Sequence, residues 1–555
     1  MSRGVRVAWL AAALAFVALW MVRSLWPALD PLVVQDDARQ HVFWMQRLVD
    51  PTLLRDDLYA DYFASQAPPG YVLLFRALLL VADPLTASKL LPPILGLVAA
   101  LFTFLLVQRL YPSGPAAFLA TVLGSWYVWQ YDDLPTGSPR AFLLPLTVLL
   151  LYGLAAGWRW WAIVGVVAAE ALVYPSAAAL GVALVGARLV CLDRWPPRPS
   201  TDRAAWATAV ACAVVCVALL APTVFGSSPF GPTVDARTAL EMPEFGPGGR
   251  NAFFTPDPYE YWVVSYRSGF DLRVTDALVP GLPIFYGLLA LASLLSVAAA
   301  ARRWRPGGPR LGPVAAMSVQ IIVASLALFL AAHALLFRLY LPARFVAWTV
   351  PLALSICAGV GIAALLQSTL GSLGRGRAVT AVVLLLAGGL ALYPARFDGN
   401  FVTDRTPEIT AYLRTLPPDA LVVGAPVEAD SVPAFSGRRV LVNREYALAY
   451  HLGFYRQVEQ RASDAIAAYY AESPRELQEL ASRYGLTVFL VNRAAFEPAT
   501  AADAWAGSFA PYTAEVVRRV EGGRRFALED AARRCGALTE QDVTVVPAAC
   551  LATLR

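Results

Sequence analysis

Charged residues are scarce in this sequence. Asp, Glu, Lys and Arg make up 15% of its 555 residues, whereas hydrophobic residues make up 58%. Soluble domains carry about 25% charged residues, so this composition excludes an ordinary soluble protein and predicts an integral membrane protein. The net charge of +5 is small for the length. Nucleic acid is therefore not expected as a partner.

Lysine is almost absent. Lys89 is the single lysine among 45 basic residues, and the others are arginines. Many of these arginines lie in short segments between apolar runs, which is typical of the signals that orient membrane helices.

Histidine and cysteine are also few, with three and six residues. His41, His333 and His451 are far apart, and no cluster of His or Cys has the spacing of a zinc site. The sequence also lacks internal repeats and a glycine loop that cradles phosphate. Cys535 and Cys550 both lie in the polar C-terminal region, and we expect them to form a disulfide if that region is outside the cytoplasm.

Apolar runs dominate the first 395 residues. A helix needs roughly 20 apolar residues to cross a bilayer, which predicts about eleven transmembrane helices in a polytopic α-helical protein. The first is interpreted as an uncleaved helix and not as a signal peptide, because its apolar run is too long. The stretch 70–83 is predicted to be half-inserted or interfacial, with an extra span as the alternative. The eleven spans are 7–27, 86–108, 115–131, 139–156, 159–174, 176–192, 204–225, 279–301, 312–335, 346–367 and 378–395.

The arginine distribution orients these helices. With a cytoplasmic N-terminus, the arginine-rich segments fall on the cytoplasmic side. Residues 28–69 and 226–278 then form external loops of a transmembrane domain, 1–395. Residues 396–555 form a soluble α/β domain outside, with strands expected at 420–426, 439–443 and 487–492 and a helix over 464–485 that ends at Gly485. We expect the inner membrane of a bacterium.

The first external loop carries two pairs of acids, in "QDDARQHVFWMQRLVDPTLLRDDLYADYF". Asp36 and Asp37 have two interpretations. Either residue is suited to cap a helix from about 38 to 49, or a carboxylate faces a cavity near the membrane surface. Capping and catalysis are compatible, because one Asp can cap while its neighbour points elsewhere. Asp56, Asp57 and Asp61 are interpreted as solvated loop residues.

Arginines also lie on the external side, where the orientation rule places few. Arg140 is either a phosphate ligand or an interfacial residue that extends to the headgroups, and Asp133 is a candidate partner for it. In "HALLFRLYLPARF" one short turn gathers polar groups, which predicts a site for an anionic headgroup. These groups are His333, Arg338, Tyr340 and Arg344.

Two further features are less specific. Glu170 lies inside an apolar span near its outer end, so it is either part of a substrate site or a hydrogen-bonding partner of a neighbouring helix. The loop 226–278 contains "PDPYEYW" and "YRSGFDLR". Their aromatic rings and mixed charges suit the binding of sugars.

Together these features resemble the GT-C superfamily of membrane glycosyltransferases, which includes protein O-mannosyltransferases, aminoarabinose transferases and oligosaccharyltransferases. The resemblance rests on the Asp36–Asp37 pair in the first external loop, the many spans, the outward arginines and the external C-terminal domain, over about residues 1–400. The tail segments "VNREYALAYHLGFYRQVEQR" and "YGLTVFLVNR" also look like the external domain of bacterial members.

The resemblance implies an inverting transfer of a sugar from a polyprenyl-phosphate donor to a glycan, lipid or protein acceptor. By analogy Asp36 is the general base and Asp37 orients it or the acceptor. Arg338, Arg344 and Arg140 hold the lipid phosphate. The likeness to oligosaccharyltransferases implies an alternative role for the acidic pair, in which it holds a divalent cation, Mg²⁺ or Mn²⁺.

Two other classes of protein compete with this interpretation. A transporter or flippase of lipid-linked sugars is expected to show interrupted helices in two related halves, and this symmetry is not visible. A non-catalytic membrane protein with an external partner-binding domain accounts for the tail but leaves the acidic pair and the outward arginines unexplained.

Overall fold

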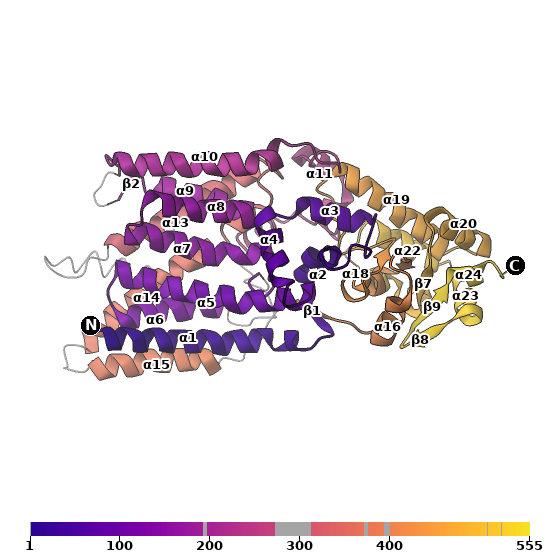
Figure 1. The fold of residues 1–555 in the computed structure, drawn as a ribbon, viewed down its shortest axis with the longest axis horizontal. Coiled ribbons are helices and arrows are strands. Elements are labelled where there is room, and N and C mark those ends of the chain that lie inside the picture. The colour runs from indigo at the N-terminus through magenta and orange to yellow at the C-terminus, as the bar shows by residue number, and fades with distance from the viewer. Residues whose placement is uncertain are drawn as a thin grey trace.

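A computed structural model gives the fold of the chain. The N-terminal part is an array of apolar helices, and the C-terminal part is a smaller region built around a β-sheet (Figure 1). The predicted span 279–301 lies outside the described residues, as do Asp132 and the arginine-rich stretch 302–310. The structure describes residues 2–131, 133–192, 197–271, 312–370, 376–392, 400–507, 509–522 and 524–554.

Ten apolar helices run side by side in the array (Figure 1), with α6 packed on α14 and α5 packed on α7. Each of them falls on one of the ten predicted spans within the described residues. They are α1 (Arg3–Leu25), α5 (Pro84–Leu110), α6 (Gly114–Val128), α7 (Leu143–Ala156), α8 (Trp160–Val173), α9 (Pro175–Ala187), α10 (Arg203–Phe225), α13 (Gly312–Ala334), α14 (Thr349–Leu370) and α15 (Gly376–Leu392).

Six helical segments in the described part of the chain are long and apolar enough to cross a membrane, and five more apolar helices are shorter. The protein is therefore a multi-pass membrane protein, but the predicted count of eleven is not confirmed. Val210, Val214 and Val217 on α10 are about three-fifths exposed. Apolar side chains repeated at this helical spacing on an outer surface are expected where lipid is the solvent.

α4 (Pro69–Leu78) has ten residues. At 1.5 Å per residue such a helix is about 15 Å long, half the thickness of the hydrocarbon core. Leu73, Leu80 and Val81 in and just after α4 are at least two-thirds exposed. This length fits the half-inserted helix predicted for 70–83 and leaves α4 too short to be the extra span.

The C-terminal region contains a mixed five-stranded sheet in the order β6-β5-β7-β9-β8. β5 is parallel to both β6 and β7, whereas β9 is antiparallel to β7 and β8. The three predicted strands are confirmed. The strands are β5 (Leu421–Gly424), β6 (Arg439–Val440), β7 (Val488–Asn492), β8 (Leu538–Glu540) and β9 (Val543–Pro547).

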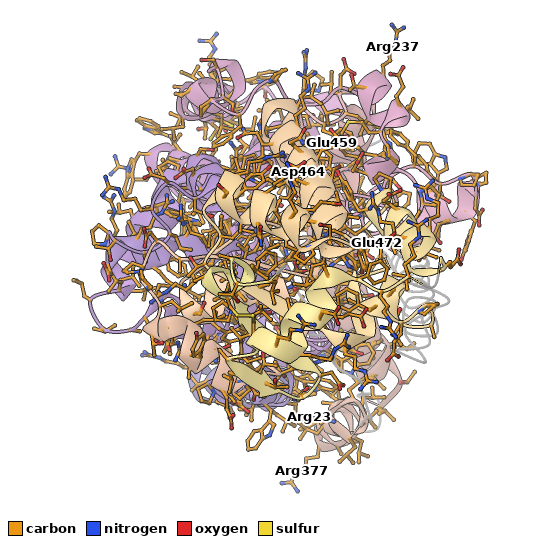
Figure 2. All side chains as sticks on the ribbon, turned by 90° about the vertical axis from the view of Figure 1, so that its right-hand side faces the viewer. Arg23, Arg237, Arg377, Glu459, Asp464 and Glu472 are labelled. Carbon is orange, nitrogen blue, oxygen red and sulfur yellow. A yellow bond between two sulfur atoms is a disulfide. The ribbon has the colours of Figure 1, made fainter. Side chains whose placement is uncertain are left out.

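The helix predicted over 464–485 is two helices, α19 (Leu452–Tyr469) and α20 (Pro474–Tyr484). Ser473 caps α20 and Pro474 takes its first position, where the missing proline N–H costs nothing. Gly485 ends α20 in a left-handed conformation, with φ at +67°, as predicted. From the C-terminal end, Figure 2 shows Glu459 and Asp464 of α19 on the face of the molecule opposite the helix array.

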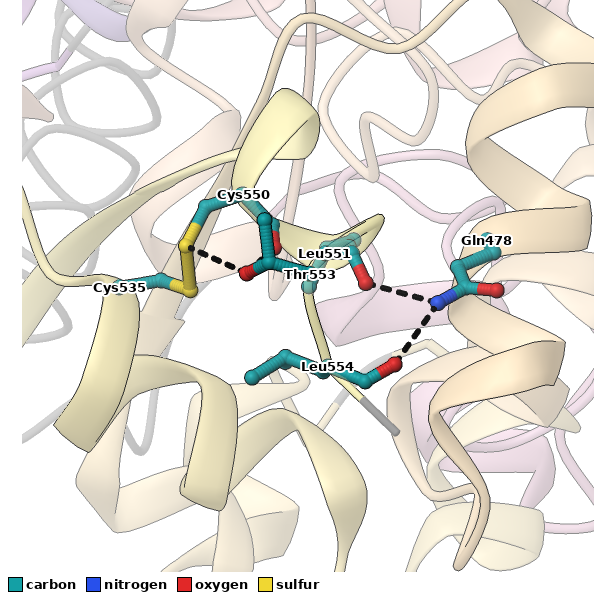
Figure 3. The surroundings of a disulfide bond; sticks show 6 residues. All are labelled: Gln478, Cys535, Cys550, Leu551, Thr553 and Leu554. Carbon is teal, nitrogen blue, oxygen red and sulfur yellow. Dashed lines mark hydrogen bonds between the residues drawn. A yellow bond between two sulfur atoms is a disulfide. The ribbon is translucent and has the colours of Figure 1, made fainter.

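The disulfide between Cys535 and Cys550 ties the end of α23 (Ala527–Cys535) to α24 (Ala548–Leu551), with 5.9 Å between the Cα atoms (Figure 3). Beside it, the Gln478 side chain of α20 donates hydrogen bonds to the carbonyl oxygens of Leu551 and Leu554. The C-terminal end of the chain is therefore anchored on α20.

A two-stranded antiparallel sheet joins the first external segment to the start of the C-terminal region. β1 (Val33–Gln35) pairs with β4 (Phe401–Thr403), with Val34 opposite Val402. The Asp36 amide, directly after β1, donates to the carbonyl of Asn400 at 2.9 Å. This pairing sets the start of α2 (Asp36–Val42) between the helix array and the C-terminal region.

The other described elements are short. Outside the C-terminal region they are η1 (Trp26–Leu29), η2 (Phe43–Leu48), α3 (Leu58–Gln66), η3 (Pro139–Phe142), β2 (Val190–Cys191), β3 (Arg198–Pro199), α11 (Ala236–Glu241), η4 (Pro243–Phe245), η5 (Glu260–Val264) and η6 (Pro342–Phe345). Within it they are α16 (Pro407–Thr415), α17 (Pro426–Ala429), α18 (Val432–Ser436), η8 (Arg493–Phe496), α21 (Ala501–Ala504) and α22 (Tyr512–Val520).

Candidate functional site

A cavity of about 470 Å³ opens between the helix array and the C-terminal region. Six of the residues singled out from the sequence line it, although they come from three separate segments of the chain. They are Asp36, Asp37, Asp133, Arg140, Tyr340 and Arg344. The large loop adds Arg250, Asn251, Glu260, Tyr266, Arg267 and Asp271, and the C-terminal part adds Asn400, Leu448 and Tyr450.

The two acids of the first loop occupy the first two positions of α2. The cap of this helix is Gln35, whose side-chain oxygen accepts the Ala38 amide at 3.0 Å. The interpretation of Asp36 or Asp37 as the capping residue is therefore wrong. Because a neutral side chain satisfies the helix start, both carboxylates are available to the cavity. Their negative charge still suits the positive end of a helix.

Asp37 belongs to a network of alternating charges on the cavity wall. Its carboxylate forms an ion pair with Arg140, whose Nε also lies 2.9 Å from Asp133 Oδ1. Arg344 Nη1 donates to the same Asp133 oxygen at 3.0 Å. All four side chains are at most a quarter exposed. The pairing of Asp133 with Arg140 considered from the sequence is present, and it holds two guanidinium groups side by side.

Asp36 belongs to a second network, which runs from the cavity wall into the interior. It pairs with Arg39 one turn later on α2, and Arg39 also lies 3.5 Å from Glu445. Arg250 binds the other oxygen of Glu445 at 2.6 Å. Sequence reasoning missed Arg39, Arg250 and Glu445. The only signal was that Glu445 falls in the tail segment "VNREYALAYH" used for the family resemblance.

Burial and neighbouring charges set the protonation of these groups. Burial raises the pKa of Asp37, but the Arg140 guanidinium, with help from His41 and Arg344, outweighs it, so the pKa lies below its ordinary value. Burial lowers the pKa of His41 to about 4, against the opposing effect of Asp37. At neutral pH Asp37 is therefore ionised and His41 is neutral.

The large loop is fixed by Arg267. Its guanidinium donates to the carbonyl oxygens of Ala252 and Arg250, both at 3.0 Å, and lies 4.8 Å from the centre of the Tyr266 ring. The residue is 7% exposed. The loop therefore presents Tyr266 and Glu260 to the cavity from a rigid base. The sequence had indicated only an aromatic, sugar-compatible loop.

Three residues of the predicted site do not line the cavity. His333 Nε2 is 2.8 Å from the Ser268 carbonyl, and its ring packs against Trp262 and Phe329, so it anchors the large loop on α13. Arg338 lies in the same turn as Arg344 but is exposed at its surface. Neither residue is therefore placed in the cavity with Arg344 and Tyr340.

The third is Glu170, which is fully buried in α8 against Gly181 of α9. Neither carboxylate oxygen has a hydrogen-bond partner within the described residues. The hydrogen bond to a neighbouring helix, one of the two alternatives for Glu170, is therefore not formed among these residues.

Two other acids of the first loop have structural contacts. Asp57 is 3% exposed and caps α3 by accepting the Ala60 amide at 2.8 Å. Asp61 pairs with Arg47 at 2.6 Å. The prediction of a solvated loop residue was therefore wrong for Asp57, because its side chain replaces water at the start of a buried helix.

The three cavity acids that are paired with arginines do not suit a divalent cation. Such an ion requires several oxygen ligands with free negative charge, whereas Asp36, Asp37 and Asp133 each face a guanidinium. In the part of the chain that the structure describes, no three His, Cys, Asp or Glu side chains gather as a metal site. The donors present suit an anion held by arginines instead.

Comparison with known proteins identifies the fold. No family model and no curated protein matches the sequence. Among solved structures, the oligosaccharyltransferase of Archaeoglobus fulgidus in its apo form matches with a TM-score of 0.55 and 12% identity, over 92% of this chain and 72% of that one. The same enzyme with an inhibitory peptide and a dolichol-phosphate matches with a TM-score of 0.50 and 13% identity, over 91% and 72%. The chain therefore shares its fold with this archaeal oligosaccharyltransferase.

Proposed function

We propose that the protein is an inverting glycosyltransferase that moves a sugar from a polyprenyl-phosphate donor to an acceptor at the outer face of the membrane. One observation carries this proposal. The Asp36 and Asp37 carboxylates and the Arg140 and Arg344 guanidinium groups line a single cavity. A base for an acceptor hydroxyl and a cradle for a leaving phosphate are the two components that such a transfer needs.

In the proposed reaction, Asp36 takes the proton of the acceptor hydroxyl as its oxygen bonds to the anomeric carbon. The bond between that carbon and the phosphate oxygen breaks, and its electron pair leaves with the polyprenyl phosphate. Arg140 and Arg344 stabilise the charge that develops there. Attack opposite the leaving group inverts the anomeric centre. The Asp37 carboxylate holds the Arg140 guanidinium in place at the cavity wall through their ion pair.

The membrane arrangement belongs to the same proposal. The start of α1 and the C-terminal region lie at opposite ends of the helix array (Figure 1). A cytoplasmic N-terminus, favoured by the arginine distribution, then places the cavity and residues 396–555 outside. We propose a bacterial inner membrane with 1–395 as the transmembrane domain.

The neighbouring structures support the donor and acceptor classes. The Archaeoglobus fulgidus enzyme has been solved with a dolichol-phosphate and with a tethered acceptor peptide containing an NVT sequon. Because the fold is shared, we propose that this chain also uses a lipid-linked donor, and that its acceptor is a glycan, a lipid or a protein. A protein whose external region only binds a partner is disfavoured, because Asn400, Leu448 and Tyr450 from that region line the cavity.

The test supplies the purified full chain, in lipid nanodiscs, with synthetic decaprenyl-phosphate hexoses and pentoses and with glycan, lipid and peptide acceptors. Release of decaprenyl phosphate is followed by mass spectrometry, and the anomer of the product is read by NMR. We expect release from at least one donor, with inversion. Movement of donor between leaflets without release would instead support a flippase.

A further inference from the structure

Glu445 is a buried carboxylate in the C-terminal region that the proposed reaction does not use directly. Its side chain is 1% exposed and has three arginines around it. Arg250 lies 2.6 Å away, and Arg39 and Arg444 each lie 3.5 Å away. Burying a charge is costly unless it is paired, and these arginines supply the pairing.

Glu445 contacts residues that line the cavity from two different segments of the chain. Gln40, which lines the cavity from α2, donates to the Glu445 carbonyl at 2.7 Å. Arg250, which lines it from the large loop, donates to the same carbonyl at 3.0 Å. Glu445 is therefore the point where the first external segment, the large loop and the C-terminal region meet.

The most direct link runs through Arg39. This guanidinium lies between two carboxylates, Asp36 on the cavity side and Glu445 on the buried side. The Arg39 side chain is 7% exposed, and Ser431 of the C-terminal region accepts a further hydrogen bond from it at 2.9 Å. A planar, multiply bound guanidinium has one orientation, so the group that holds Arg39 also sets where Asp36 lies.

We propose that Glu445 is a positioning residue for the transfer site: it holds Arg39 and Arg250 and, through Arg39, fixes the Asp36 carboxylate at the cavity wall. The inference rests on the proposed function for its catalytic consequence. The C-terminal region then has a role in the reaction, because it supplies Glu445, the buried end of the Asp36–Arg39–Glu445 series of ion pairs. A misplacement of about 1 Å at a reacting group can cost 10²-fold in rate.

The protonation of Glu445 supports this role. Burial raises its pKa to about 7; nearby arginines oppose the shift and Asp36 adds to it. Because the pKa is raised, the carboxylate becomes neutral as the pH falls below about 7 and then releases Arg39 and Arg250. The charged groups that face it are Asp36 and Arg39 on α2, Arg250 on the large loop, and Asp430 and Arg444 within the C-terminal region.

The experiment uses Glu445→Gln in the full chain, which keeps the side-chain shape and the main-chain hydrogen bonds but removes the charge. We expect kcat to fall by about 10- to 100-fold while KM for the lipid donor changes by less than about twofold. The acidic limb of the kcat–pH profile should move to lower pH, because the group that titrates near pH 7 is gone. Glu445→Asp, which restores the charge, should recover part of kcat.

A second measurement does not depend on the reaction. Hydrogen–deuterium exchange of residues 36–48 should become about tenfold faster in Glu445→Gln, because α2 loses its buried anchor. Glu244→Gln is the matched control: Glu244 is also buried, but its side chain accepts the Tyr455 hydroxyl at 2.9 Å and does not belong to the Asp36–Arg39–Glu445 chain. It should leave both exchange and kcat unchanged. If Glu445→Gln does not fold, Arg39→Lys breaks the same chain and should give the same losses.

The outcomes separate the two proposals. Unchanged exchange over 36–48 together with unchanged kcat in Glu445→Gln overturns the role of Glu445. A loss equal in Glu244→Gln and Glu445→Gln also overturns it, because the effect is then general destabilisation. A wild-type chain that transfers no sugar overturns the proposed function, and the exchange measurement still decides whether Glu445 positions α2.

Discussion

Arg344 Nη1 lies 3.0 Å from Asp133 Oδ1, although 211 residues separate the two along the chain. The same oxygen is 2.9 Å from Arg140 Nε. One buried carboxylate thus brings two guanidinium groups together, and like charges remain adjacent only because it lies between them. The proposed anion site of the cavity is therefore built from helix-array turns and not from a continuous motif.

The first prediction concerns Asp36. Asp36→Asn should lower the transfer rate by roughly 10²-fold or more, the usual scale for losing a general base, while donor binding is retained. Gln35 caps α2, so the change leaves the helix start intact. Asp61→Asn is the control in the same loop, because Asp61 is half-exposed and paired with Arg47. If Asp36→Asn retains the full rate, Asp37 becomes the candidate base.

Arg344 should contribute mainly to donor binding. Arg344→Ala removes one charge-assisted hydrogen-bond donor, which corresponds to about 1.5–3 kcal/mol, or an affinity for decaprenyl phosphate lowered by roughly 10- to 100-fold. Arg338→Ala, in the same turn but outside the cavity lining, should bind normally. Native mass spectrometry of both variants in nanodiscs measures this. Equal losses in the two variants would point to a general surface charge effect.

The orientation of the chain is tested by access from outside. Protease added to intact spheroplasts should remove residues 396–555, because we place the cavity and this region on the external side. A tag at the N-terminus should stay protected in the same sample. A C-terminal region that is protected until the membrane is opened contradicts the orientation.

The Cys535–Cys550 bond closes a loop with a sequence separation of 15. Cross-links of this length stabilise by about 3 kcal/mol, so Cys535→Ser should lower the melting temperature of the C-terminal region by several degrees. Cys191→Ser, at a free cysteine, should not. Peptide mass spectrometry without reduction identifies the bond itself, and two free thiols in exported protein would refute it.

Glu170 should not be required for transfer. It is fully buried between α8 and α9 and does not line the cavity. Glu170→Gln preserves its size and should leave kcat and donor affinity within about twofold, since no cavity contact is lost. A large loss of transfer with normal folding would restore Glu170 to the site.

Much of the architecture followed from composition and spacing. Apolar runs located all ten membrane-array helices within the described residues, because a hydrocarbon solvent imposes length and hydrophobicity directly on sequence. Three of the five strands of the C-terminal sheet were likewise visible as short apolar runs, and Gly485 as a helix end, whereas β8 and β9 were missed. The break at Pro474 was missed, although proline at a first helical position is a local signal.

Residue chemistry also identified part of the cavity lining. Asp36, Asp37, Arg140 and Arg344 were recognisable because charges next to membrane helices are costly and are kept where they have partners or ligands. The sequence could not separate Arg344 from Arg338, six residues earlier in the same turn. Which of the two enters the cavity depends on how that turn packs, and packing is not encoded in residue type.

Only the tertiary structure decided the remaining contacts. Glu445, Arg250 and Arg39 are ordinary charged residues in sequence, and nothing local marks them as partners. Pairing of β1 with β4 and docking of α2 on the C-terminal region bring them together across about 400 residues of chain. The sequence alone determined which segments are apolar enough to lie in lipid and which charged residues are energetically costly next to them. The fold determined which charges meet, because ion pairing depends on distances between segments that are remote along the chain.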